Sequence, residues 1–224
     1  MIKCYITREE FEKLKNDDKF VTAIRLLRME SAIITSLSLY ERTINDEDEG
    51  TNRNNRDRLE IILYYGATLY ESLKTFSRMK GDLENLKLKN SDEYEKNIEE
   101  INKLINELNN KDSFVKKILG NIRDRLVFHF DKNPFSETLP ILDTSECELI
   151  ILEGDSYASG DANYPIIYEI YYNYLIKNSP AEGSDEEKLE KIFNEMNSIS
   201  AKFHEIIGKI AREILKDYVH CKET

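Results

Sequence analysis

Three side chains that could act on a phosphate ester lie close together in the segment 122–130, which reads IRDRLVFHF. Arg123 and Arg125 carry guanidinium groups, and a guanidinium binds phosphate through charge-assisted, bidentate hydrogen bonds. His129 is one of only 3 histidines in the chain, and an imidazole accepts or donates a proton near neutral pH. This is therefore the segment in which the sequence favours ribonuclease-like chemistry.

The helical spacing of these residues decides which of them can act together. Apolar residues recur along 115–126, which predicts a helix whose buried stripe continues to position 129. On an ideal helix Arg125 and His129 share a face, whereas Arg123 points about 120 degrees away from His129. One interpretation is a functional histidine in a groove. The other is a core histidine, with the arginines bound to acidic neighbours such as Asp124.

The order Arg123, Asp124 and then His129 resembles the signature of the HEPN superfamily, in which an arginine and a polar residue precede a histidine. The runs 63–71 (LYYGATLYE) and 127–131 (VFHFD) are also similar to segments of bacterial proteins in this group. The resemblance implies a HEPN-like all-α bundle that is often dimeric. It also implies, for many members, metal-independent endoribonuclease activity in toxin–antitoxin or phage-defence systems.

The resemblance further implies a role for each residue of the segment. Arg123 would bind the scissile phosphate, and Asp124 would orient Arg123. His129 would transfer protons, and Arg125 is a second candidate for charge stabilisation. Attack by the 2′-hydroxyl of RNA needs both a base and an acid, so we expect a homodimer in which two copies of His129 share a cleft. Arg123 and His129 reach one cleft only if the helix ends or distorts near Val127.

Apolar residues at helical spacing predict an all-α bundle of five or six helices in a single domain, residues 1–224. The expected helices cover roughly residues 20–44, 55–81, 92–110, 113–129, 165–175 and most of 185–219. Residues 45–52 are expected to form an acidic loop. Residues 133–163 are expected to form an irregular insertion, and the preceding helix should stop before Pro134.

Two of the expected helices carry a long apolar stripe that should face the core. In the first, we expect the buried positions to be Phe20, Ile24, Leu27, Ile34, Leu37 and Leu39. In the last, they are Leu189, Ile192, Phe193, Met196, Ile199, Phe203, Ile206, Ile207, Ile210 and Ile214. Capping boxes are expected where Thr7 precedes Glu10 and where Ser184 precedes Glu187, because each pair has the spacing of that motif.

The remaining clusters of polar residues have simpler interpretations. No glutamate lies three residues before a histidine, so a di-iron site is not encoded, and neither a metal nor a cofactor is expected. Asp217 and His220 are expected to be a surface pair, and His204 a solvated or capping residue. The tyrosines between positions 164 and 174 could line a ligand surface, although packing at the edge of the core is favoured.

The net charge and the positions of the cysteines limit which partners the protein is expected to bind and in which cellular compartment it is expected to lie. The net charge of -11 disfavours broad binding to nucleic acid or membranes, so any contact with RNA must be local. Cys4, Cys147 and Cys221 are far apart in the sequence, so neither a disulfide framework nor a zinc site is expected, and the thiols should be reduced in a cytoplasm. Charged residues interrupt every apolar stretch, so no contact with a membrane is expected.

Two functions thus remain open from the sequence. The first is a ribonuclease with an RNA substrate and a protein partner such as an antitoxin. The alternative is a non-catalytic helical protein whose long final helix mediates dimerisation or binds a partner. The acidic charge favours the second function, and the segment from Arg123 to His129 favours the first.

Overall fold

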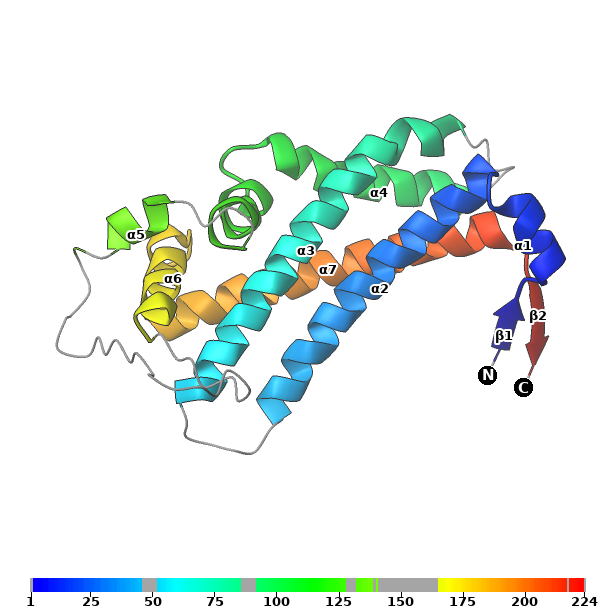
Figure 1. The fold of residues 1–224 in the computed structure, drawn as a ribbon. Coiled ribbons are helices and arrows are strands. Elements are labelled where there is room, and N and C mark those ends of the chain that lie inside the picture. Colours follow the sequence, from blue (N-terminus) through cyan, green and yellow to red (C-terminus); the bar gives the residue numbers. More distant parts are fainter. Residues whose placement is uncertain are drawn as a thin grey trace.

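The computed structural model describes residues 2–45, 52–85, 92–127, 132–138, 140, 165–216 and 218–223. These residues form an all-α helical bundle with one small two-stranded sheet (Figure 1). In chain order the elements are β1 (Ile2–Tyr5), α1 (Arg8–Leu14), α2 (Asp18–Asn45), α3 (Asn52–Asn85), α4 (Asp92–Asn109), the π-helical segments η1 (Val115–Leu119) and η2 (Ile122–Val127), α5 (Lys132–Thr138), α6 (Pro165–Asn178), α7 (Asp185–Leu215) and β2 (His220–Glu223). The predicted all-α fold class is confirmed.

The long helices α2 and α7 pack side by side in opposite directions (Figure 1). Glu30 Oε1 in the middle of α2 lies 3.7 Å from Arg212 Nη1 near the end of α7. Further along α2, the ring centroid of Tyr40 lies 4.0 Å from that of Phe193 near the start of α7. Because later positions of α2 meet earlier positions of α7, the two helices are antiparallel.

Helix α3 packs against both α2 and α7 and runs parallel to α7. The Tyr65 hydroxyl donates a hydrogen bond to Asn197 Oδ1 at 3.2 Å. About three turns later in α3, Phe76 packs edge-to-face on Phe203, with ring centroids 5.9 Å apart and planes at 80°. These contacts increase together in residue number along both helices. The three long helices thus form the frame on which the shorter elements lie.

The shorter elements occupy both ends of this frame. Helices α5 and α6 contact each other at the end of the bundle far from β1 and β2 (Figure 1). Helix α4 and the segments η1 and η2 pack along α3. The candidate site residues of segment 122–127 are therefore positioned mainly by α3.

Local sequence signals explain where two of the helices begin. Thr7 accepts a hydrogen bond from the backbone of Glu10, and the Glu10 carboxylate accepts one from the backbone of Thr7. Ser184 and Glu187 form the same reciprocal pair at the start of α7. Both predicted capping boxes are confirmed, and each satisfies backbone N–H groups that lack a partner within the helix.

The apolar stripe of α7 is buried as predicted. Eight of its expected positions are buried: Ile192, Met196, Ile199, Phe203, Ile206, Ile207, Ile210 and Ile214. Leu189 and Phe193, near the start of the helix, are half-buried. The long final helix is therefore confirmed, because Asp185–Leu215 covers most of the predicted range 185–219.

The expected stripe of α2 is confirmed at Phe20, wrong at three positions, and half-buried against the core at Leu27 and Leu37. Ile24, Ile34 and Leu39 are exposed, while the buried apolar positions are Phe20, Ala23, Leu26, Met29 and Ile33. Apolar residues occur around most of this helix, so periodicity alone does not select its core face. The small Ala23 and the buried Ser36, whose hydroxyl donates to the carbonyl of Ala32 at 2.8 Å, lie on the face that packs.

Two expected boundaries also change. Helix α3 continues through Gly81 to Asn85, because Gly81 does not adopt the positive φ with which a glycine ends a helix. Residues 132–138 are helical rather than irregular. Pro134 lies in the first turn of α5, where a missing backbone N–H costs no intrahelical hydrogen bond. Residues 141–163 of the expected insertion and 46–51 of the acidic loop lie outside the described residues.

The small sheet was not expected from the sequence. Strands β1 and β2 are antiparallel, and they bring the first and last described residues side by side (Figure 1). Among the described residues, no helix is long and apolar enough to cross a bilayer.

Candidate functional site

The segment that carries the candidate site packs its apolar face on α3. Ile122 and Leu126 of η2 are buried, as are Val115, Ile118 and Leu119 of η1, so the predicted stripe of this helical segment is confirmed over residues 115–126. Close approach to α3 depends on Gly66, because a Cβ there would lie 3.1 Å from Ile122 Cδ1 and 3.3 Å from Met196 Cε. This packing fixes which side of η2 faces outward.

The backbone of the segment is π-helical rather than α-helical over 115–119 and 122–127. A π-helix closes i→i+5 hydrogen bonds, so its turn is wider than that of an α-helix. Over residues 122–127 the rotation of about 100 degrees per residue of an ideal α-helix therefore does not apply. The helix thus departs from α-helical geometry up to Val127, and π-helical interruptions occur frequently at functional sites.

Arg123 lies between two carboxylates. Its Nε is 2.5 Å from Glu71 Oε1 of α3, and its Nη1 donates to Asp124 Oδ1 at 2.6 Å. The Arg123 side chain is 21% exposed, against 33% for Glu71 and 44% for Asp124. The hydrogen bond to Asp124 is the main cause that raises the pKa of Arg123, and the charges of Glu71 and Asp124 add to it, while burial acts in the opposite direction. Arg123 is thus a fixed cation at the α3–η2 contact.

Lys74 extends this ion-pair group along α3. Its Nζ lies 4.0 Å from the same Oε1 atom of Glu71 that pairs with Arg123. Glu71 therefore lies between two cations, and both it and Asp124 hold Arg123 in one orientation. Asp124 thus contacts Arg123 in the way its expected orienting role requires.

Arg125 points into a different contact. Its Nη1 donates a hydrogen bond to the hydroxyl of Tyr174 at 2.9 Å. Tyr174 belongs to α6 and is buried. Arg125 therefore ties η2 to α6, and the structure does not bring it to the carboxylates that hold Arg123.

The tyrosines between positions 164 and 174 were expected to pack at the edge of the core or to line a ligand surface. Tyr171 and Tyr174 are buried and belong to the core, and burial is the main cause that raises the pKa of Tyr171. Tyr172 is half-buried and packs against the same core. The side chains of Tyr164 and Tyr168 lie outside the described residues. The positions that are described support packing at the edge of the core.

His129 itself lies outside the described residues, which reach Val127 and resume at Lys132. The other two histidines are placed. His204 Nδ1 lies 2.9 Å from the carbonyl oxygen of Ser200, one turn earlier in α7, so its ring is bound to its own helix.

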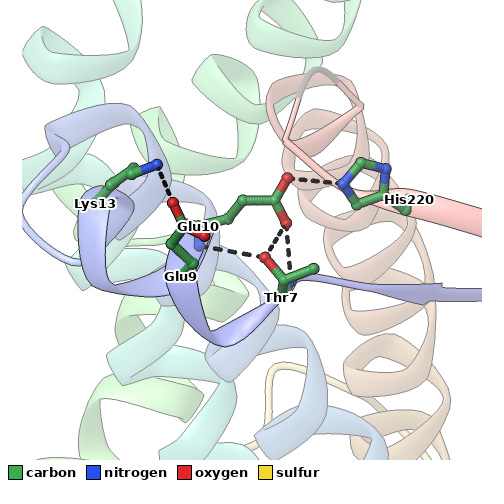
Figure 2. Close-up of polar contacts among 5 residues, drawn as sticks. All are labelled: Thr7, Glu9, Glu10, Lys13 and His220. Carbon is green, nitrogen blue, oxygen red and sulfur yellow. Dashed lines mark hydrogen bonds and ion pairs between the residues drawn. The ribbon is translucent and has the colours of Figure 1, made fainter.

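His220 is exposed, as expected of a surface residue, while Asp217 lies outside the described residues. His220 lies in β2, and its Nε2 is 2.7 Å from Glu10 Oε1 of α1 (Figure 2). The other oxygen of this carboxylate accepts hydrogen bonds from the backbone and the hydroxyl of Thr7 at 2.9 and 2.6 Å. The Thr7 hydroxyl is therefore bound to a carboxylate and not to the imidazole, so the three groups do not form a nucleophile with its base.

Glu71 is the residue of this site that the sequence spacing of candidate catalytic residues did not predict. It closes the run 63–71, which was noted only for its similarity to other proteins. The available signal was its place on α3: Leu69, Tyr70 and Leu73 around it are buried, so position 71 lies at the border of a core-facing stripe. Lys116 of η1 contacts the residue of α3 that precedes Glu71, since its Nζ lies 3.3 Å from the Tyr70 hydroxyl.

Among the described residues, no group of three or more histidine, cysteine or acidic side chains is placed to hold a metal ion. The arrangement instead offers a guanidinium held at the surface by carboxylates, with further cations near it. In comparisons with protein-family models, curated proteins and solved structures, none matches this chain, so the HEPN resemblance rests on the residues quoted for it.

Proposed function

We propose that this chain is a HEPN-like, metal-independent endoribonuclease that acts as a homodimer. The observation that carries the proposal is the position of Arg123, a partly exposed cation that is oriented by Asp124 and Glu71. It lies on a π-helical segment that ends two residues before His129 in the sequence. In the proposed reaction Arg123 binds the scissile phosphate and His129 transfers protons. Neutralisation of the developing phosphorane charge by a fixed cation is often the largest single contribution to such catalysis.

Local charge supports contact with an anionic substrate. Residues 115–127 contain the basic residues Lys116, Lys117, Arg123 and Arg125 and a single acidic residue, Asp124, in a chain whose net charge is -11. Asp124 is 44% exposed, so its bond to Arg123 lies where a phosphate oxygen can compete for the guanidinium. The site therefore suits a local contact with RNA better than a broad electrostatic surface.

The homodimer follows from the number of proton-transferring groups that the reaction needs. A base must accept the proton of the 2′-hydroxyl while an acid protonates the leaving oxygen, and the segment supplies one histidine per chain. A twofold axis beside this segment would supply the second histidine and double the local positive charge. The family resemblance adds a protein partner such as an antitoxin and a cytoplasmic location, which belong to the same proposal.

A non-catalytic interaction protein is the second candidate, and one observation favours it. Arg123 is paired with Glu71 and Asp124, and Arg125 with Tyr174, which is the arrangement expected of arginines that hold helices together. In that case the same residues would stabilise the fold without touching RNA. The two candidates therefore differ in what loss of the Arg123 guanidinium does to activity at constant fold.

The test is RNA cleavage in the presence of EDTA by the full chain and three variants. Arg123→Gln should lower the cleavage rate about 10²-fold or more, a size typical for loss of one group that stabilises transition-state charge. Arg123→Lys keeps the charge but not the planar, bidentate geometry, so an intermediate rate is expected. Arg28→Gln, at an exposed position of α2, is the matched control and should cleave like wild type.

Circular dichroism of each variant separates loss of function from loss of fold. Equal cleavage by folded Arg123→Gln and wild type would contradict the proposed role of Arg123. Sedimentation velocity on the same samples tests the dimer, because a 26.3 kDa monomer that cleaves RNA at micromolar concentration would remove the shared cleft.

A further inference from the structure

The two-stranded sheet places two cysteines opposite each other. Strands β1 and β2 are antiparallel, and their register pairs Cys4 with Cys221 and Tyr5 with His220. These cysteines stand near opposite ends of the 224-residue sequence, which is why their spacing gave no sign of a pair. The fold thus brings together two thiol-bearing positions that the sequence separates.

Side chains from α1 and α2 fix this register next to the cysteine pair. The rings of Tyr5 and His220 are in contact, with centroids 5.6 Å apart, and His220 is bound to Glu10 of α1 (Figure 2). Just before β2, the ring of Tyr218 packs edge-on against Phe20 of α2 at 6.2 Å. A slip of β2 by one residue would break these contacts, so the pairing of Cys4 with Cys221 is specified from outside the sheet.

The spacing of opposed positions in such a ladder suits a disulfide. Cα atoms of directly opposed residues in antiparallel strands lie about 4.5 to 5.5 Å apart. A disulfide accepts Cα separations of about 4.4 to 6.8 Å. Opposed Cβ atoms lie roughly 4.5 to 5.5 Å apart and must approach by up to about 1 Å, and in this sheet that movement displaces no third strand.

Residues that can carry a positive charge flank both cysteines in the sequence. Lys3 precedes Cys4, and His220 and Lys222 flank Cys221. Positive charge near a thiol lowers its pKa and raises the fraction of thiolate, which is the nucleophile in disulfide exchange.

We propose that Cys4 and Cys221 form a reversible intramolecular disulfide by exchange with a small-molecule disulfide such as oxidised glutathione. The thiolate of one cysteine attacks a glutathione sulfur, which forms a mixed disulfide and releases one glutathione thiolate. The thiolate of the other cysteine then attacks the protein sulfur of that mixed disulfide and releases the second glutathione. Two cysteine thiols are oxidised, one glutathione disulfide is reduced, and the two thiol protons pass to the released glutathiones.

The bond would close a loop that contains nearly the whole chain. A long loop loses much of its freedom in the unfolded state when its ends are joined, so the oxidised protein should unfold at a higher temperature. For a chain of this size we expect Tm to rise by roughly 5 to 15 °C on oxidation and to return on addition of dithiothreitol.

The experiment treats the full chain with oxidised glutathione and maps its peptides by mass spectrometry without reduction. The matched control is Cys147→Ser, which removes the third thiol and should still give the peptide that joins Cys4 to Cys221, with both glutathiones released. Cys4→Ser and Cys221→Ser should each stop at a glutathione adduct on the remaining cysteine. The rise in Tm should occur in wild type and Cys147→Ser alone.

Three results would overturn the proposal. The first is a Cys147→Ser protein that keeps only glutathione adducts, and the second is a disulfide between two chains as the main product. The third is a Cys4–Cys221 bond that leaves Tm unchanged or lowers it, because a bond made in the native register must stabilise that register. None of these outcomes depends on ribonuclease activity.

Discussion

Truncation of Phe203 to alanine tests the packing of the three long helices. Phe203 is 0% exposed and lies where α7 meets α3, with its ring against Phe76 at 5.9 Å. Removal of a fully buried phenylalanine costs about 3 to 5 kcal/mol, because the transfer free energy and the cavity left behind add together. The aromatic pair places this site toward the upper part of that range. The loss is a large part of the roughly 5 to 15 kcal/mol that holds a domain folded.

Urea unfolding followed by circular dichroism measures this loss, with Tyr64→Ala as the control. Tyr64 is also aromatic and helical but is 52% exposed, so its truncation should cost less than about 1 kcal/mol. The melting temperature of Phe203→Ala should fall by roughly 6 to 20 °C. A loss below about 0.5 kcal/mol for Phe203→Ala would refute the reasoning, because it would mean that this face of α7 is in solvent.

Further predictions concern a close helix contact and the pair at the start of α1. Gly66→Val should lower the free energy of unfolding by about 1 to 3 kcal/mol, because even a Cβ at this position would lie 3.1 Å from Ile122 Cδ1. Gly81→Ala should raise the free energy of unfolding by up to about 1 kcal/mol, because an added Cβ there would meet no atom within 4 Å. Urea unfolding that ranks the two variants the other way would contradict the packing. Hydrogen bonds from Thr7 lower the pKa of Glu10 from 4.5 to about 2, so the stabilisation by Glu10 is complete above pH 4.5 and is lost as the pH falls toward 2. Urea midpoints measured over this interval should fall less steeply for Glu10→Gln than for wild type, and identical slopes would mean that the carboxylate is not perturbed.

The fold was largely readable from the sequence where one helical face is apolar and the other charged. Helix α7 has such a face, and its cap at Ser184 and its buried stripe followed directly from residue types and spacing. Helix α2 has apolar residues on most sides, so its core face was set by the neighbours that cover it and not by its own pattern. The sheet could not be predicted, because its pairing joins residues from opposite ends of the chain.

The candidate site was readable only in part. The pairing of Arg123 with the adjacent Asp124 followed from neighbouring positions, but Glu71 reaches Arg123 only through the packing of η2 on α3. The π-helical backbone left no signal in the spacing of apolar residues, because the positions 115, 118, 119, 122 and 126 also fit an α-helix. Tertiary contacts, not local pattern, therefore decide the geometry of this segment.

The central claim is that His129 serves RNA cleavage through the 2′-hydroxyl without a metal. The most direct measurement incubates RNA with wild-type protein, His129→Ala and the control His204→Ala in EDTA, and analyses the rate and the new ends. The account predicts 2′,3′-cyclic phosphate ends from wild type and His204→Ala, and a rate lower by about 10² to 10⁴ for folded His129→Ala. Cleavage by His129→Ala at the wild-type rate, or no cleavage by any of the three folded proteins, would contradict it.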